Sequence, residues 1–351
     1  MGDSDGHDGL TSLLERFREG SVPALARAIS IVEDQREGFQ DLLHAVLERQ
    51  PTARRVGFTG PPGGGKSSLV VAAANFYLAQ EDHVGVVAVD PSSPYSGGAL
   101  LGDRIRMNDL ATDRGIFIRS MATRGSLGGL ATTTKEVLDV MDAFGFDRVL
   151  VETVGVGQTG LEITAAADTV VVVLVPESGD AIQAMKAGLM EIADIFVVNK
   201  ADRPGSARLV ENIRQAMHLR AGHALKDVPV DHGVDPGRVA REEEQTGPVS
   251  ADDGWATPVL TTNALTEEGV PDLLDAIDRH RDWLETSGQL GARRRNRDRA
   301  RVRDVVDREM RRAAWRSDDI RTRLDAGLDR IEGGEGTPYS VAREILDELL
   351  R

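Results

Sequence analysis

Short apolar segments alternate with helical patterns over most of the chain. Between residues 51 and 285, the runs HVGVVAVD (83–90), FDRVLVET (146–153) and DTVVVVLVP (168–176) are nearly continuous in aliphatic residues. Strands that are apolar on both faces are typical of a parallel sheet covered by helices on its two sides. The pattern therefore predicts an α/β fold, with a mostly parallel sheet flanked by helices, over residues 51–285.

The N-terminal residues have a helical pattern instead. In the run ALARAISIVEDQ, Leu25, Ile29 and Val32 recur at intervals of three or four residues, as on one face of a helix. This spacing predicts a helical N-terminal extension over residues 1–50.

The C-terminal residues are also helical in pattern, but they are polar and rich in arginine. Val302, Val306 and Met310 follow one another at four-residue spacing, which predicts a helix with one apolar stripe. We expect a helical arm over residues 286–351. The arginine run RRRNRDRARVR (293–303) of this arm is interrupted by Asp298 and contains no aromatic residue, a pattern more typical of a solvated helix than of a nucleic-acid surface.

A glycine-rich segment follows the first predicted strand. The sequence GPPGGGKS (60–67) fits the phosphate-binding pattern G-x-x-x-x-G-K-[ST], between the strand RRVGFT and an apolar helix. Glycines let backbone N–H groups surround phosphate oxygens, and the helix N-terminus adds partial positive charge. In this motif Lys66 contacts the terminal phosphates and Ser67 binds magnesium. The predicted nucleotide contacts here are Gly60, Pro61, Pro62, Gly63, Gly64, Gly65, Lys66, Ser67 and Ser68.

A second motif predicts which base is bound. Asn199, Lys200 and Asp202 form N-K-x-D at the end of an apolar strand. The carboxylate of Asp202 can accept hydrogen bonds from N1–H and the 2-amino group of guanine, whereas adenine would leave it unpaired. The motif therefore favours GTP over ATP.

The segment TTNALTEEG stands where GTPases carry a Ser-Ala loop beside the guanine. Asn263 replaces the serine, while Ala264 and Leu265 fit the pattern. We expect the backbone contacts of this loop to persist and a contact specific to the serine to be lost.

Three carboxylates are candidates for holding magnesium and the hydrolytic water. Asp90 and Glu152 each end a predicted strand, and Asp103 lies in GALLGDRIRM. The carboxyl ends of parallel strands line the ligand crevice of an open α/β sheet. With Ser67, these residues are the predicted magnesium ligands, and Lys66, Asp90, Asp103 and Glu152 are the predicted catalytic residues.

The composition of the chain excludes several kinds of partner and site. The net charge of −15 argues against nucleic acid as a general partner. The chain has no cysteine, which excludes disulfides, zinc ribbons and thiol nucleophiles, and it has no apolar run long enough to span a membrane. Because the N-terminal sequence does not resemble a signal peptide, we expect a cytoplasmic protein.

Several long motifs together resemble the MeaB/ArgK family of P-loop GTPases, which accompany methylmalonyl-CoA mutase. They are GPPGGGKSS, VAVDPSSPYSGGALLGDRIRM, FDRVLVETVGVGQ, VPESGDAIQAMKAGL and NKAD, and the likeness extends over nearly the whole chain. The resemblance implies the P-loop NTPase fold and a homodimer formed through the C-terminal arm. It assigns the magnesium and water-organising positions to Ser67, Asp90, Asp103 and Glu152.

The resemblance also implies residues that respond to the mutase. Gly155 to Gln158 match the switch after the strand that ends at Glu152, and residues 179–189 match a second switch, with Asp180, Gln183 and Lys186 at its polar positions. Gln158 lies three residues after Gly155 rather than next to it, so the spacing does not assign it the role of orienting water.

The function implied is that of a GTP-hydrolysing chaperone. It would gate the loading of adenosylcobalamin and protect its partner, which is methylmalonyl-CoA mutase or a related adenosylcobalamin-dependent mutase. Magnesium would be its cofactor, and GTP and GDP its substrate and product. Two alternatives are a metallochaperone GTPase and an ATP-dependent kinase of an amino-acid transport system. The scattered histidines speak against the first, and N-K-x-D speaks against the second.

Overall fold

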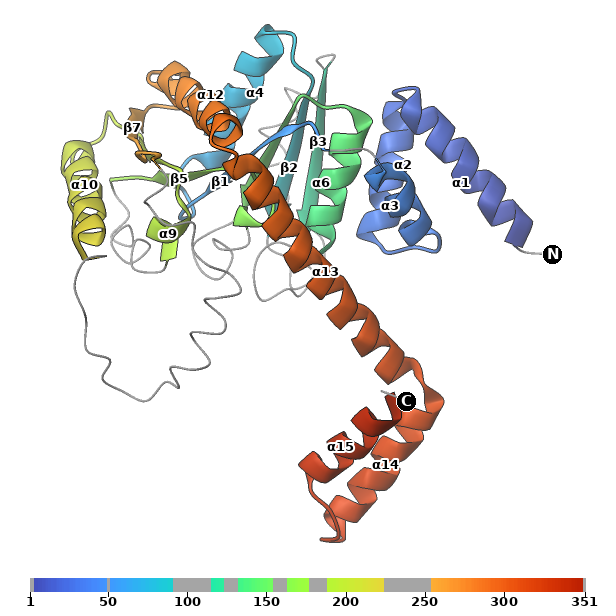
Figure 1. Ribbon diagram of the computed structural model, residues 1–351. Helices are drawn as coiled ribbons and strands as arrows, with labels where there is room; N and C mark the ends of the chain where they lie inside the picture. Colours follow the sequence, from blue (N-terminus) through green and yellow to red (C-terminus); the bar gives the residue numbers. More distant parts are fainter. Residues whose placement is uncertain are drawn as a thin grey trace. The chain divides into compact units, whose positions relative to one another are not determined.

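The computed structural model describes residues 3–48, 51–90, 115–122, 132–153, 163–176, 188–223 and 254–349. The chain divides into two compact units, residues 1–291 and 292–351. Within the described residues, all strands belong to the first unit, and the second unit is helical (Figure 1).

The described part of the first unit is built on one seven-stranded sheet in the order β3-β2-β4-β1-β5-β6-β7. Each neighbouring pair of strands is parallel, which confirms the predicted α/β architecture. Consecutive parallel strands require a crossover. In the described residues, helices lie in the crossovers from β1 to β2, β3 to β4, β5 to β6 and β6 to β7. The strands are β1 (Arg54–Thr59), β2 (Val84–Asp90), β3 (Ile116–Ala122), β4 (Arg148–Thr153), β5 (Thr169–Leu174), β6 (Ile195–Asn199) and β7 (Val259–Thr262).

Helices cover both faces of this sheet, which explains the continuous apolar runs. In β4, Val149 and Val151 pack with α6 (Thr132–Phe144) on one face. Leu150, between them, packs on the other face with α4 (Lys66–Ala79) and α12 (Val270–Thr286). Because alternate residues of a strand point to opposite faces, every residue of β4 is buried. Among the described residues, α9 (Met190–Ile192) and α10 (Ser206–His223) also pack with the sheet.

The N-terminal helices belong to the same compact unit. They are α1 (Asp3–Arg18), α2 (Val22–Glu33) and α3 (Phe39–Leu47). Leu25, Ile29 and Val32 are fully buried in a core that they share with α6. An ion pair between Glu33 of α2 and Arg119 of β3 joins these helices to the edge strand.

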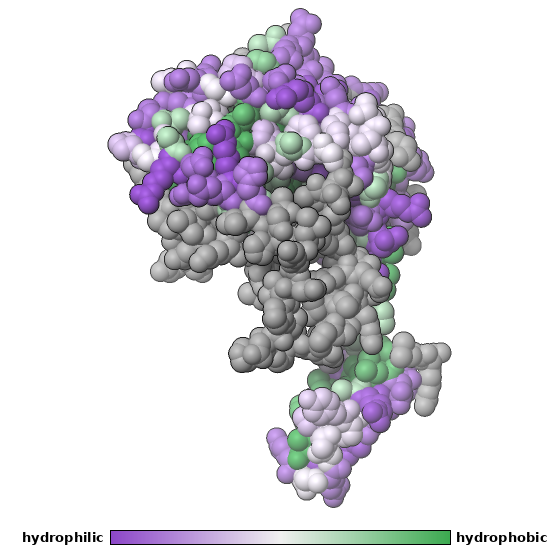
Figure 2. Space-filling view, turned by 60° about the vertical axis from the view of Figure 1, so that its left-hand side comes forward, coloured by the Kyte–Doolittle hydropathy of each residue, from purple (hydrophilic) through white to green (hydrophobic). Residues whose placement is uncertain are grey.

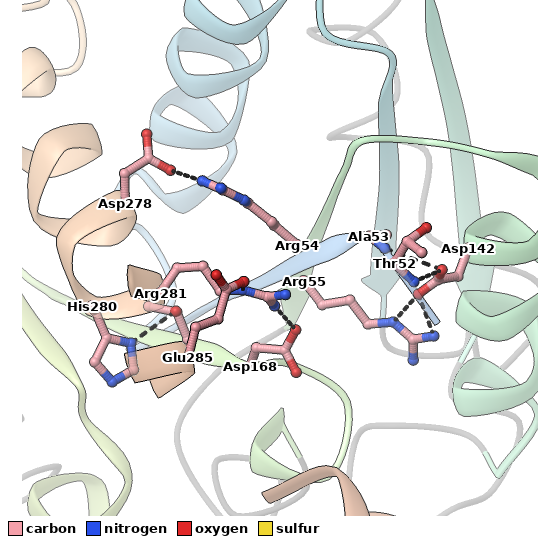
Figure 3. A network of polar contacts seen from close by, with 11 residues as sticks. Thr52, Ala53, Arg54, Arg55, Asp142, Asp168, Asp278, His280, Arg281 and Glu285 are labelled. Carbon is pink, nitrogen blue, oxygen red and sulfur yellow. Dashed lines mark hydrogen bonds and ion pairs between the residues drawn. The ribbon is translucent and has the colours of Figure 1, made fainter. Parts of the chain in front are cut away.

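Buried ion pairs hold the beginning of β1 in place (Figure 3). Arg55 donates to Asp142 at 2.9 Å and to Asp139 at 2.8 Å, both on α6. Asp142 also accepts hydrogen bonds from the backbone N–H groups of Thr52 (2.8 Å) and Ala53 (3.1 Å). One carboxylate therefore fixes the strand to the helix and satisfies the backbone that leads into it.

The second unit contains a helical hairpin. After α13 (Gln289–Arg316), the helices α14 (Asp318–Glu332) and α15 (Pro338–Leu349) pack through Ile320, Val341 and Ile345. The sequence GTPYS starts α15, where Thr337 Oγ1 accepts a hydrogen bond from the N–H of Ser340. Apolar residues remain on the surface of this unit, where Figure 2 shows hydrophobic residues (green) beside hydrophilic ones (purple). Val302, Val306 and Met310 of α13 are about half exposed or more.

The Asp142 contacts generate a stability prediction. Asp142→Ala leaves Arg55 buried with one carboxylate fewer and removes the acceptor of two backbone N–H groups, so we expect a loss of about 3–5 kcal/mol. Urea unfolding followed by circular dichroism measures it. Asp275→Ala is the control, because its partner Arg279 and Asp275 itself are both exposed, and we expect less than about 1 kcal/mol. Equal effects in the two variants would contradict this assignment.

Candidate functional site

The glycine-rich segment forms a tight loop between β1 and α4, and two of its glycines cannot be replaced without movement. Gly60 has φ +137°, and a Cβ there would lie 2.0 Å from the carbonyl oxygen of Val173. Gly65 has φ +81°, and its Cβ would lie 2.3 Å from Nδ2 of Asn199. Since both contacts involve packed neighbours, the loop depends on glycine for its conformation and for its close approach to β5 and β6.

Lys66, the first residue of α4, is held under this loop. Its Nζ donates to the carbonyl oxygens of Gly60 at 3.0 Å and Pro61 at 3.1 Å. The side chain is buried, so its charge is not diluted by bulk water. The positive charge and the N-terminus of α4 therefore act at the same place, where an anion would be bound.

Ser67 and Glu152 meet at the carboxyl end of the sheet. Ser67 Oγ donates to Glu152 Oε1 at 2.7 Å, and both residues are buried. Asp90 ends the strand next to β4, one residue beyond the Val89–Thr153 pair. The backbone of Asp90 therefore ends at the same edge of the sheet as Glu152, whose side chain accepts the hydrogen bond of Ser67.

The Asn199 side chain joins the phosphate loop to the other motifs. Its Nδ2 donates to the carbonyl oxygen of Gly64 at 2.9 Å. Its Oδ1 accepts from Thr262 Oγ1 at 3.2 Å and from the N–H of Ala264 at 3.1 Å. One buried amide therefore connects the loop after β1 with the ends of β6 and β7.

Asp202 and Asn263 face each other across the ends of β6 and β7. Asn263 Nδ2 donates to Asp202 Oδ1 at 3.1 Å. A contact specific to the serine of other GTPases was expected to be lost here, but the longer amide of Asn263 forms a side-chain contact of its own. The neighbouring Lys200 has a left-handed backbone, with φ +56°, which turns the chain between Asn199 and Asp202.

These motifs surround one cavity of about 630 Å³, a volume typical of small-molecule sites. It includes most of the predicted nucleotide contacts; Gly60, Pro61 and Gly64 are not part of its lining. Arg203 also lines the cavity, and sequence reasoning missed it because no motif includes it, although it directly follows Asp202. The lining residues are Pro62, Gly63, Gly65, Lys66, Ser67, Ser68, Glu152, Asn199, Lys200, Asp202, Arg203, Asn263, Ala264 and Leu265.

Other predicted residues lie outside the described part of the chain. The side chain of Asp90 is among them, although its backbone is described. So are Asp103, Gln158, Asp180, Gln183 and Lys186.

Comparison with known proteins decides which family carries this site. The family model described as methylmalonyl Co-A mutase-associated GTPase MeaB matches residues 25–319. The chain belongs to the MeaB family. A protein from Pyrococcus abyssi that is named as a GTPase is 40% identical to this chain, and the alignment covers 97% of each chain.

More distant relatives agree with this membership. The mouse protein named methylmalonic aciduria type A homolog, mitochondrial, is 30% identical over 97% of this chain and 82% of its own length. A solved structure named LAO/AO transport system kinase has a TM-score of 0.65 and 26% identity, and covers 97% of this chain and 98% of its own. The chain is therefore a P-loop GTPase, which binds GTP and GDP and hydrolyses GTP. This follows from the family membership, from the phosphate loop and from the names of the relatives.

No helix in the described residues of this MeaB protein is long and apolar enough to cross a membrane.

The close contact at Gly65 generates a second prediction. We expect Gly65→Ala to weaken GDP binding at least about tenfold, because the strained φ and the clash with Asn199 would displace the phosphate loop. Gly288→Ala is the matched control, since Gly288 has φ +76° but no atom within 4 Å of a Cβ. Titration calorimetry with GDP tests both variants; unchanged binding in Gly65→Ala would show that the loop tolerates a side chain here.

Proposed function

We propose that this MeaB-family GTPase is a magnesium-dependent chaperone that gates the loading of adenosylcobalamin and protects methylmalonyl-CoA mutase. GTP hydrolysis is supported by one cavity, which is lined by Lys66, the Ser67–Glu152 pair and the motif from Asn199 to Asp202. The family description supports the mutase part.

The donor set at Ser67 and Glu152 fits magnesium. Mg²⁺ prefers oxygen ligands and is bound in nucleotide sites by one or two protein oxygens together with phosphates and water. A hydroxyl and a carboxylate oxygen lie 2.7 Å apart here, at the helix that begins under the phosphate loop. When bound, the ion would neutralise phosphate charge. Ser67 and Glu152 would hold it, together with Asp90 and Asp103.

The protein's own groups would act mainly by position and charge. Phosphoryl transfer needs little covalent participation from the enzyme, so fixed cations and N–H donors supply most of its catalysis. Lys66, anchored by the carbonyl groups of Gly60 and Pro61, would hold its charge against the transferred phosphate. Glu152 is placed one hydrogen bond from Ser67, where it would also organise the attacking water.

The guanine would bind at the other end of the cavity. Asp202 would accept its N1–H and 2-amino groups, and Lys200 and Leu265 would cover its faces. Leu265 supports this placement because it is apolar and yet 89% exposed at the cavity wall. Covering it with an aromatic base would remove that apolar surface from water.

The sheet order supports a link from the nucleotide to the mutase. The two predicted switches, residues 155–158 and 179–189, follow β4 and β5, which lie on either side of β1. Because parallel strands end at the same edge, β4 and β5 both end beside the strand that leads into the phosphate loop. A change at the terminal phosphate could therefore alter both segments.

The exposed stripe of α13 supports a homodimer. Val302, Val306 and Met310 present apolar side chains at four-residue spacing on a helix that is rich in arginine. A second copy of the arm would bury this stripe.

A third prediction tests hydrolysis. Lys66→Ala should slow GTP hydrolysis by roughly 100-fold or more, because it removes the buried charge that faces the phosphates. Phosphate release, measured with GTP and with ATP, checks the rate and the choice of base. Arg279→Ala removes an exposed cation from α12 and should retain the wild-type rate. Faster hydrolysis of ATP than of GTP by the wild type would instead favour the ATP-dependent kinase.

A fourth prediction tests coupling to the mutase. Lys186→Ala should leave basal GTP hydrolysis nearly unchanged and reduce its stimulation by methylmalonyl-CoA mutase, because Lys186 belongs to the predicted partner switch. Binding coupling is reciprocal, so the effect of nucleotide on mutase affinity should also shrink. Hydrolysis with and without the mutase measures this. If the mutase stimulates GTP hydrolysis equally in Lys186→Ala and the wild type, Lys186 is not part of the proposed partner surface.

A further inference from the structure

The loop between β7 and α12 is closed at its base by Asn263. The N–H of Asn263 donates to the carbonyl oxygen of Glu268 at 2.9 Å, in an isolated antiparallel bridge. The loop then enters α12 through Gly269, which has φ +72° and whose Cβ would lie 2.2 Å from the carbonyl oxygen of Thr261. Both ends of the loop are therefore fixed to the core of the sheet.

The side chain of Asn263 makes two contacts through two different atoms. Oδ1 accepts from the N–H of Leu265 at 3.1 Å, which fixes the loop and the orientation of the amide. Nδ2, on the other side of the amide, donates to Asp202 Oδ1 at 3.1 Å. A serine would have to accept and donate through a single oxygen closer to the backbone, whereas asparagine separates the two tasks.

The Asp202 carboxylate needs such a contact to be oriented. Asp202 is exposed in the turn after β6, and the terminal torsion of an aspartate is broad, so the carboxylate can rotate when it is not restrained. A donor at Oδ1 restricts this rotation without neutralising the charge. Each carboxylate oxygen has two acceptor sites, so Oδ1 can accept from Asn263 and from a ligand at once.

From this geometry we infer that Asn263 is a positioning residue, which orients Asp202 and thereby sets the selectivity for guanine. The inference rests on the proposed binding of guanine by Asp202. Asp202 is exposed and Asn263 half-buried, so their hydrogen bond adds little to folding stability. A bound base would exclude water and strengthen it. Asn263 therefore acts on affinity and selectivity far more than on stability.

Substitutions at residue 263 separate the two contacts. Asn263→Asp keeps an acceptor for the N–H of Leu265, but it replaces the donor to Asp202 with a second negative charge. Asn263→Ala removes both contacts, and Asn263→Ser restores a shorter donor. Asn75→Asp makes the same chemical change at an exposed position of α4 and is the control.

The readout is the dissociation constant of the full-length protein for GDP and for inosine diphosphate, which lacks only the 2-amino group. We expect Asn263→Ala to lose about tenfold in GDP affinity, and Asn263→Asp to lose more because its charge repels Asp202. Asn263→Ser should recover part of the loss. The preference for GDP over inosine diphosphate should fall severalfold in both weakened variants, with unfolding midpoints near those of the wild type and Asn75→Asp.

Two results would overturn the inference. Wild-type GDP affinity in Asn263→Asp would mean that only the turn to Leu265 matters, and equal losses for the two nucleotides would indicate a merely structural role. Asp202→Asn distinguishes these failures from failure of the guanine site itself. If that variant weakens GDP while Asn263→Asp does not, the positioning role alone is wrong. If Asp202→Asn leaves GDP binding unchanged, Asp202 is not the guanine acceptor. In that case the guanine site and the positioning role of Asn263 are both wrong.

Discussion

The Asn199 amide is the contact on which the geometry of the nucleotide site depends. It bonds to Gly64 of the phosphate loop, to Thr262 at the end of β7 and to Ala264 in the loop beyond. The bonds to Gly64 and Thr262 are buried and the bond to Ala264 is partly buried. Because an unmade buried hydrogen bond is costly, the three segments are held in one arrangement. The close approach of Asn199 to Gly65 follows from the same arrangement and explains why the residue before Lys66 has no side chain.

The sheet supplies the framework for this contact. β1, β5, β6 and β7 are neighbours, so the phosphate loop and the two guanine motifs leave the same edge within a few strand spacings. Such a sheet must be apolar on both faces, so its polar groups lie at the ends of its strands. At the amino ends they form ion pairs such as Arg55–Asp142 and Arg281–Asp168, which fix strands to helices (Figure 3). At the carboxyl ends they form the site.

The polar groups at the amino ends of the strands stabilise the fold, whereas those at the carboxyl ends line the site. Asp142 satisfies a buried arginine and two backbone N–H groups, so its contacts are already complete in the protein. Glu152 and Asp202 lie along a cavity, and their oxygens can accept further contacts from a ligand. In this MeaB-family protein, polar contacts within the protein therefore close the amino edge of the sheet, whereas the carboxyl edge lines the cavity.

The sequence by itself determined the fold class and most of the site. Continuous aliphatic runs predicted buried parallel strands, and GPPGGGKS and NKAD predicted the phosphate and guanine ends of one cavity. Local patterns were sufficient there because each motif is a short stretch whose backbone depends on its own residues. Tertiary structure decided the contacts between motifs. The bond between Asn263 and Asp202 joins residues 61 positions apart, and Arg203 reaches the cavity only through the turn after β6. No local pattern contains either contact, because each arises only when the parallel sheet brings the ends of its strands together.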